Sequence, residues 1–347
     1  MNVAFLANSF HLTKTRSADF FIALLRDAFG TVDVIPHKEA WAELPKRKRD
    51  LIVVWQHRYD PEELEAFGAD RVVLVPMYDD TPLDEAFWAR YRKFKVFCFS
   101  STLERLLVSY GLQAWGLRYY PDPADFPRAD WSGGLRGFFW PRTRAIDWLL
   151  VKALSGGASF ERMHLHWTPD VHGDLPPPVG EAELSAGNVE LSSWFRDAAE
   201  YWGILAASNV FFASRVAEGI GMSFLEAMAM GLCVVAPRAP TMSEYLEDGA
   251  NGLLYDPASP GPLDFSRAAE LGRAARASCD RGRIAWMEGL PRIAAFFEEP
   301  AAGYRPRLHP AIEAKGRATA VARRIYRALK RIVHGAARVI IDLNAHL

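Results

Sequence analysis

The segment that most constrains the fold is an apolar run followed by a glycine loop and a helical pattern, within residues 210–231. Val210–Ala213 predicts a short buried strand. Gly219 and Gly221 interrupt the pattern, and from Met222 onward the apolar spacing is helical. Glycine lets the backbone approach a ligand, and a helix start offers unpaired N–H groups and the positive end of the helix dipole. The segment therefore predicts a strand, loop and helix arrangement that can hold phosphate.

Apolar runs of strand length alternate with helical segments along most of the chain. In the first half the predicted strands are Val3–Ala7, Val32–Ile35, Leu51–Trp55, Val72–Val75, Val96–Phe99 and Trp115–Tyr119. The first helix is predicted at Ser17–Phe29 and ends at Gly30. A second series begins at Gly137–Trp140 and continues through a helix at Ala145–Leu154 and a strand at Met163–His166. Apolar strands separated by helices indicate a parallel, doubly wound sheet in each half. The predicted fold class is α/β, with two Rossmann-like domains facing a central cleft.

A proline-rich stretch precedes the tetrapeptide Trp131–Gly134, which is the predicted linker. We expect an N-terminal domain over residues 1–130, a C-terminal domain over 134–300 and a basic segment over 311–347. In sheets of this kind, ligands bind beyond the carboxyl ends of the strands. The strand ends are therefore the places to search for chemistry.

Composition excludes several classes of protein. The chain has 347 residues, which is enough for two domains. Its net charge of −1 gives no general attraction to nucleic acid. Cys98, Cys233 and Cys279 are scattered and predict buried thiols in a reducing compartment. We see no apolar stretch of transmembrane length and no signal peptide. A cytoplasmic location is expected.

Residues 213–257 resemble the donor-binding element of GT-B-fold glycosyltransferases, most closely the retaining enzymes of family 4. The pattern of that family is Glu-Gly-Phe-Gly-Leu, then Leu-Glu-Ala-Met-Ala, then a glycine and a buried strand. This chain supplies Glu218–Met222, Leu225–Ala229, Gly231 and Cys233–Ala236, and the match continues to Pro257. The resemblance implies two Rossmann-like domains and transfer of a sugar from a nucleotide-sugar donor.

The resemblance also implies roles for this loop. Glu218 would lie beside the transferred sugar, and Glu226 would bind the ribose hydroxyls of the nucleotide. The loop and helix start would contact the donor through Gly219, Gly221, Met222 and Ser223. Two alternatives stay open. Ser223 and Glu226 also fit a capping box that closes the first turn of a helix, and Glu218 also fits an exposed loop carboxylate.

Arg142 and Arg144 follow the first predicted strand of the second half. Relatives carry an Arg and a Lys in this region, where they bind the donor diphosphate. Here the spacing is shorter and no Lys is present. Arginine suits this contact because its fork matches phosphate oxygens. The alternative is a pair of solvated arginines, although a cation beside a helix start is unfavourable unless an anion binds there.

The acceptor should bind the N-terminal half. Polar candidates at predicted strand ends are His57, Asp79 and Asp80, although a lone His or Asp in such a place also fits a structural role. His164 and His166 alternate on a strand without a nearby cysteine or carboxylate, so we predict no metal site there. No Asp-x-Asp triplet occurs, which argues against a metal-dependent GT-A enzyme. No metal or other cofactor is expected.

The C-terminal segment is basic and amphipathic. Between Ala314 and Ile341 it carries eight Lys or Arg and no acidic residue, with apolar residues at helical spacing. Such a helix can lie on an anionic membrane surface at the inner face of the membrane. It can equally pack its apolar stripe on the acidic body of the protein or on a second subunit.

These patterns together predict a metal-independent, retaining glycosyltransferase that uses a nucleotide-sugar donor. The expected acceptor is a glycan or a lipid-linked glycan, as in surface-polysaccharide biosynthesis, and no nucleic acid is expected as a partner. Two alternatives remain. One is another GT-B enzyme, such as a nucleotide-sugar epimerase, and the other is a non-catalytic protein that binds a glycan or nucleotide on the same scaffold.

Overall fold

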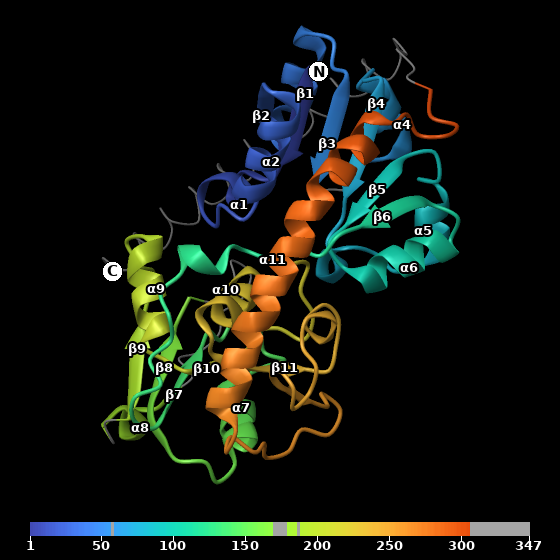
Figure 1. The fold of residues 1–347 in the computed structure, drawn as a ribbon. Helices are drawn as coiled ribbons and strands as arrows, with labels where there is room; N and C mark the ends of the chain where they lie inside the picture. The colour runs from blue at the N-terminus through green and yellow to red at the C-terminus, as the bar shows by residue number, and fades with distance from the viewer. Residues whose placement is uncertain (57–58, 169–178, 186–187, 306–347) are drawn as a thin grey trace, which may run out of the picture. The chain divides into compact units, whose positions relative to one another are not determined.

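The apolar runs form two parallel six-stranded sheets in the computed structural model, which describes residues 1–56, 59–168, 179–185 and 188–305 (Figure 1). The first sheet has the order β2-β1-β3-β4-β5-β6. Its strands are β1 (Val3–Ala7), β2 (Val32–Pro36), β3 (Leu51–Trp55), β4 (Arg71–Val75), β5 (Lys95–Cys98) and β6 (Gln113–Gly116). The second sheet has the order β12-β11-β10-β7-β8-β9. Its strands are β7 (Leu135–Phe139), β8 (Phe160–His166), β9 (Val189–Ser192), β10 (Val210–Phe212), β11 (Cys233–Pro237) and β12 (Leu253–Tyr255). The predicted α/β fold class is confirmed.

The connections between strands are mostly helical, as the crossover of a parallel sheet requires. The helices before β7 are α1 (Ser9–Thr13), α2 (Asp19–Phe29), α3 (Ala40–Glu43), α4 (Pro61–Ala66), α5 (Glu85–Ala89) and α6 (Ser101–Ser109). The later helices are α7 (Trp148–Ser155), α8 (Glu181–Ser185), α9 (Ala198–Ala206), α10 (Met222–Met230) and α11 (Ala268–Glu298). Short 3₁₀ turns lie at His37–Glu39, Leu44–Lys46, Tyr78–Asp80, Pro123–Asp125 and Met242–Glu244.

Helix boundaries follow local capping more closely than apolar spacing. The predicted first helix is α2, which ends at Gly30 with a φ of 82°. The helix predicted from Ala145 begins instead at Trp148, because the Asp147 side chain accepts the Leu150 N–H and caps it there. None of the helices in the described part of the chain could cross a bilayer.

By compactness the chain divides into two units. The first unit comprises residues 1–75, 89–95 and the chain from 294 onward, and the second comprises 76–88 and 96–293. The second unit thus contains the whole of the second sheet together with the segment that follows β4. The domain boundaries predicted from the sequence stay a prediction, and so does the segment 311–347, which lies outside the described residues.

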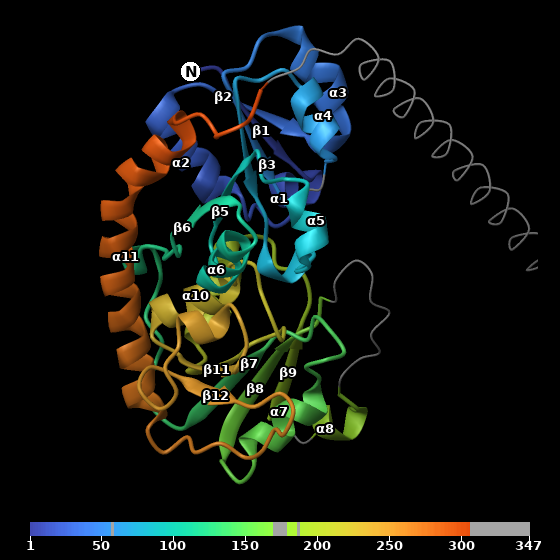
Figure 2. The same ribbon diagram turned by 90° about the vertical axis from the view of Figure 1, so that its right-hand side faces the viewer.

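Strands β10, β11 and β12 of the second sheet are buried throughout, whereas the edge strand β9 is partly exposed. One core cluster joins Phe139, Phe212 and Val235 of the sheet to Val151 of α7 and Leu271 of α11. Strands covered on both faces must be almost continuously apolar, which is why these runs stand out in the sequence. Figure 2 shows the same strands in a view turned by 90°.

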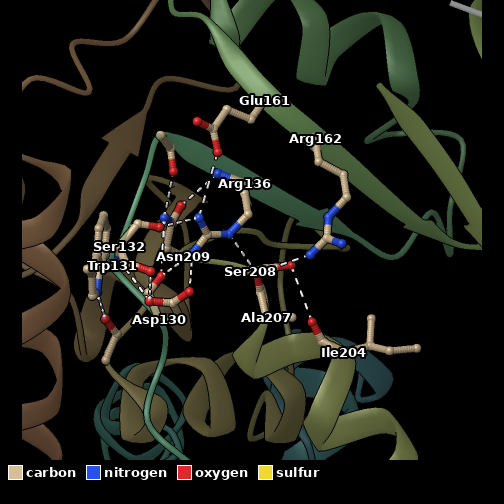
Figure 3. Close-up of polar contacts among 12 residues, drawn as sticks. Asp130, Trp131, Ser132, Arg136, Glu161, Arg162, Ile204, Ala207, Ser208 and Asn209 are labelled. Atoms are coloured by element: carbon tan, nitrogen blue, oxygen red, sulfur yellow. Dashed lines mark hydrogen bonds and ion pairs between the residues drawn. The ribbon is translucent and has the colours of Figure 1, made fainter. Parts of the chain in front are cut away.

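The chain before β7 is fastened to the amino edge of this sheet by Arg136, as Figure 3 shows. Its guanidinium donates to the carbonyls of Ser132, at 2.7 Å, and Ala207, at 2.9 Å. It also pairs with the Asp130 carboxylate at 3.2 Å. The Asn209 side chain accepts the Arg136 N–H at 2.8 Å and donates to the Gly134 carbonyl at 3.0 Å. The predicted linker is therefore held by side chains at the edge opposite the carboxyl ends of the strands.

Candidate functional site

The chain reverses its direction across the second sheet between β7 and β10. These strands are parallel neighbours, with Phe139 aligned to Phe212. From β7 the chain proceeds to β8 and β9 on one side, and from β10 it proceeds to β11 and β12 on the other. Such a switch point opens a crevice at the carboxyl ends of the two strands, where open α/β sheets bind ligands. The loops after β7 and β10 therefore define the candidate site.

The start of α10 faces this crevice without a side-chain cap. Gly221 is its N-cap residue, in the left-handed conformation with φ 78° and ψ 56°. Gly221 has no side chain that could cap the first turn, and that turn contains no acidic residue. The first N–H groups of a helix have no partner within the helix and attract anions. The predicted strand, loop and helix arrangement is present.

The start of α6, in the same unit, offers an instructive contrast. The Glu244 carboxylate accepts hydrogen bonds there from the Ser101 N–H at 2.7 Å, the Thr102 N–H at 3.0 Å and the Ser100 hydroxyl at 2.7 Å. Burial alone would raise the pKa of Glu244, but these hydrogen bonds lower it below its ordinary value. This helix start already holds an anion from its own chain, whereas the start of α10 carries none from its first turn.

Gly219 is explained by a protein contact. A Cβ atom at this position would lie 2.6 Å from the Met77 Cβ, closer than two such atoms approach. Met77, 2% exposed, belongs to the segment that follows β4. Glycine is thus needed at position 219 to admit Met77, and the contact of Gly219 with a donor stays a prediction. Packing of Met77 brings the segment after β4 against the loop after β10.

That contact brings together two of the predicted acidic residues through Arg215. The Arg215 Nη1 lies 3.3 Å from the Asp79 Oδ2, and its Nε lies 4.0 Å from the Glu218 Oε1. The three side chains are 26%, 19% and 16% exposed, respectively. Burial raises the pKa of Asp79, and the Arg215 guanidinium opposes that rise. The Thr241 hydroxyl donates to the Glu218 carbonyl at 2.9 Å and fastens the backbone of the loop.

Arg142 and Arg144 differ in their surroundings. Arg142 is half-buried and its guanidinium lies 4.9 Å from the centre of the Trp140 ring, whereas Arg144 is exposed. Arg142 also lowers the pKa of Asp79, so it lies within electrostatic reach of that carboxylate. The Thr143 hydroxyl, in the loop after β7, and the Ser214 hydroxyl, in the loop after β10, are buried without a hydrogen-bond partner in the described structure. Unpaired buried polar atoms are costly and mark a place where a ligand can bond.

Glu226 lies within α10 and does not form the capping box that the sequence left open. The helix begins at Met222, so Ser223 is inside the helix and cannot be its N-cap. Burial raises the pKa of Glu226 to about 7, and hydrogen bonding from Trp202 and Tyr201 opposes that rise. Tyr201 and Trp202 both lie on α9, and their hydrogen bonds offset only part of the effect of burial. The carboxylate is therefore held in a site that stabilises it poorly without a further donor.

The remaining candidates are less informative. His57 lies outside the described residues, and Asp80 is exposed. His164 and His166 share the Ser192 hydroxyl, at 2.8 and 2.9 Å, and burial lowers the pKa of His166 to about 3. These two rings stack on Phe138 and form part of the protein core.

Sequence reasoning missed several residues of the site. Arg215, Thr143, Ser214, Tyr201 and Trp202 were not among the candidates, although Arg215 follows β10 by only three residues. The available signal was the position of Arg215 at a predicted strand end, the same signal that singled out Asp79.

Comparison with known proteins agrees with this geometry. The family model of glycosyl transferases group 1 matches residues 136–270, which include β7, β10 and α10. Residues 136–270 are therefore similar to glycosyl transferases group 1, and the chain has a GT-B fold. The resemblance found in the sequence is thereby confirmed. No curated protein matches the sequence significantly.

Several solved structures share the fold of this chain. Sucrose-phosphate synthase from Thermosynechococcus elongatus has a TM-score of 0.62 at 13% identity, covering 86% of this chain and 98% of that one. HepE from Anabaena, solved in complex with UDP and glucose, has a TM-score of 0.56 at 15% identity and covers 84% and 100%, respectively. A glycosyltransferase from Rickettsia africae has a TM-score of 0.60 at 13% identity, covering 87% and 99%. At these identities the likeness is one of fold.

The raised pKa of Glu226 predicts that this residue costs stability at neutral and basic pH. The folded protein holds the proton up to about pH 7, whereas the unfolded chain releases it near its ordinary value of 4.5. The free energy of unfolding therefore falls as the pH rises between these values. Glu226→Gln should be more stable than the wild type at about pH 8, by about 1–2 kcal/mol after allowance for partial solvation, and equally stable at about pH 4.

Urea unfolding at both pH values measures this difference. Glu288→Gln, at an exposed position on α11, is the matched control and should show no such gain. A Glu226→Gln variant that is less stable than the wild type at the higher pH would contradict the environment assigned to Glu226.

Proposed function

We propose that the protein is a retaining glycosyltransferase that moves a sugar from a nucleotide-sugar to a glycan or lipid-linked acceptor. The observation that carries this proposal is the convergence at the switch point between β7 and β10. There the uncapped start of α10, the Arg142 guanidinium and the Glu218 carboxylate occupy the two adjoining loops. This combination suits a ligand that has a diphosphate at one end and a sugar at the other.

The donor would bind with its diphosphate at the start of α10. The helix start and Arg142 supply positive charge in the place where other glycosyltransferases use a metal ion, and we therefore propose that no metal is needed. Glu226 would accept hydrogen bonds from the ribose hydroxyls, which supply the donors that its site lacks. HepE was solved with UDP and glucose, which supports UDP as the first nucleotide to test.

The chemical step would depend on electrostatics and positioning. As the bond between the anomeric carbon and the diphosphate oxygen breaks, positive charge develops on the sugar, and the Glu218 carboxylate stabilises it. The departing diphosphate gains negative charge and can take the proton of the acceptor hydroxyl. The acceptor oxygen then bonds to the same face of the sugar, so that configuration is retained and no separate base is needed.

The acceptor would approach from the segment that follows β4. The proposal is supported by Asp79, a predicted acceptor-side residue that shares Arg215 with Glu218. The basic segment 311–347 supports a lipid-linked acceptor, because its eight cations between Ala314 and Ile341 suit an anionic membrane surface. We propose that the enzyme works in the cytoplasm at the inner face of the membrane, in surface-polysaccharide biosynthesis.

A screen of nucleotide-sugars by thermal shift tests the proposal directly, because a bound donor raises the melting temperature. The donor that binds is then incubated with glycan and lipid-linked acceptors, and products are identified by mass spectrometry. Formation of a glycoside with retained configuration is expected. Release of free nucleotide with an altered sugar and no need for an acceptor would indicate an epimerase. Binding without turnover would indicate a non-catalytic protein.

Glu218→Gln should nearly abolish transfer while leaving the fold intact. The substitution removes the negative charge beside the sugar and keeps the size of the side chain, so kcat should fall by roughly 100-fold or more. The melting temperature and the affinity for UDP should stay near their wild-type values. Glu247→Gln, at an exposed position nearby in the same unit, is the control. Wild-type turnover in Glu218→Gln would remove Glu218 from the catalytic role.

The affinity for the nucleotide should depend on the protonation of Glu226. The pKa of about 7 means that the carboxylate, which accepts ribose hydroxyls best, forms as the pH rises through that value. Calorimetric titration with UDP between about pH 6 and pH 8 should show tighter binding at the higher pH. Glu226→Gln should bind more weakly at the higher pH and show little pH dependence. An unchanged affinity in this variant would exclude the ribose contact.

Removal of the basic segment should separate membrane binding from catalysis. Each Lys or Arg near an anionic surface contributes about 1 kcal/mol, so the full chain should sediment with phosphatidylglycerol vesicles and be released by salt. A chain that ends at Pro310 should stay in the supernatant, keep its activity on a soluble acceptor and lose rate on a lipid-linked one. An unfolded or dissociated truncation, with no vesicle binding by the full chain, would instead assign the segment a structural role.

A further inference from the structure

The loop after β7 contains only part of the cationic site that a diphosphate needs. A diphosphate bound without a metal requires more than one cation, yet Arg144 is exposed and no Lys follows β7 before Lys152. Arg142 is the cation of this loop that acts on the Asp79 carboxylate and packs on the Trp140 ring. A second cation can come from a neighbouring strand end.

The loop after β10 supplies such a cation. Arg215 follows the neighbouring strand at the switch point, directly after Ser214, whose hydroxyl is buried and unpaired in the described structure. The Thr143 hydroxyl, next to Arg142 in the chain, is likewise buried and unpaired in the described structure. Two loops on adjoining strands thus each present an arginine next to an unsatisfied hydroxyl, in front of an uncapped helix start. This is the donor set that phosphate oxygens require.

Both arginines act on the Asp79 carboxylate. Its carboxylate lies 3.3 Å from the Arg215 Nη1, and the Arg142 guanidinium acts on the same carboxylate. An anion of the protein therefore already lies where both cations act. A diphosphate and the Asp79 carboxylate would compete for the Arg215 fork.

We propose that Arg215 is the second cation of the diphosphate site and that the Asp79 carboxylate competes with the diphosphate for it. This inference rests on the proposed function, since it names a further binding residue for the same donor. When the diphosphate binds Arg215, the Asp79 carboxylate is released from its ion pair. Donor binding would then free an acceptor-side carboxylate next to Glu218, so that the acceptor site is completed after the donor has bound.

The test is a set of charge substitutions in the full chain, titrated with UDP, GDP and ADP and with the matching monophosphates. Arg215→Met should lower the affinity for the tightest-binding diphosphate by about tenfold or more. It should lower the affinity for the matching monophosphate less. Asp79→Asn should strengthen diphosphate binding, because the competing charge is gone. In the double variant the gain from Asp79→Asn should disappear, since the fork that it frees is absent.

Arg162→Met is the matched control, because Arg162 lies at the amino edge of the same sheet and donates to the Ala207 carbonyl (Figure 3). It should leave affinity unchanged. A gain of affinity in Asp79→Asn cannot come from misfolding, so the proposal stays testable if Arg215→Met is unstable. Unchanged or weaker diphosphate binding in Asp79→Asn would overturn the proposal while the donor site stands. A wild-type protein that binds none of the three diphosphates would instead overturn the proposed function itself.

Discussion

The uncapped start of α10 is the constraint on which the rest of the site depends. It exists because the N-cap residue is Gly221, which has no side chain to cap the first turn and which adopts a left-handed conformation that costs a residue with a Cβ about 1–2 kcal/mol. The same turn sets the helical phase, and that phase directs Glu226 toward Trp202 and Tyr201 of α9. If Ser223 were the N-cap residue, Glu226 would be the third residue of the helix and would complete a capping box with it. Gly221 therefore decides between a helix that caps itself and a helix that leaves its first turn and Glu226 available to the proposed donor.

Several buried polar groups in the second unit lack full hydrogen bonding, which lowers the stability of the fold and which a bound ligand would offset. Glu226 is buried with few donors, Asp79 shares Arg215 with Glu218, and two hydroxyls have no described partner. The Glu244 carboxylate shows the opposite arrangement, because three neighbouring residues stabilise its charge at the start of α6. Glu244 thus has its hydrogen-bond donors within the chain, whereas the charge of Glu226 is poorly stabilised, a difference typical of structural and functional carboxylates.

The sheets, most strand positions and the donor loop could be predicted from the sequence because their signals are local. Parallel strands buried on both faces are continuous apolar runs, and the turn into α10 needs glycine within a few residues. The start of α7 was predicted three residues before its true position, because apolar spacing does not show that Asp147 is the cap. Asp79 was only one of several polar strand ends, and nothing local marks its contact with Arg215, which is more than a hundred residues away. The packing of Met77 on Gly219 could not be predicted for the same reason, since these two residues are also more than a hundred positions apart.

These long-range contacts explain why the two halves of the reaction differ so much in how well the sequence reveals them. A diphosphate site can be built from one strand, one loop and one helix start, so its residues are consecutive and its pattern is visible. An acceptor site must be assembled against that loop from segments elsewhere in the chain. Here the packing of Met77 on Gly219 determines where the segment after β4 lies, and the Asp79 ion pair determines its charge. If the proposed roles hold, changes in the segment after β4 should alter the choice of acceptor while the loop with Gly219, Gly221 and Glu218 stays the same.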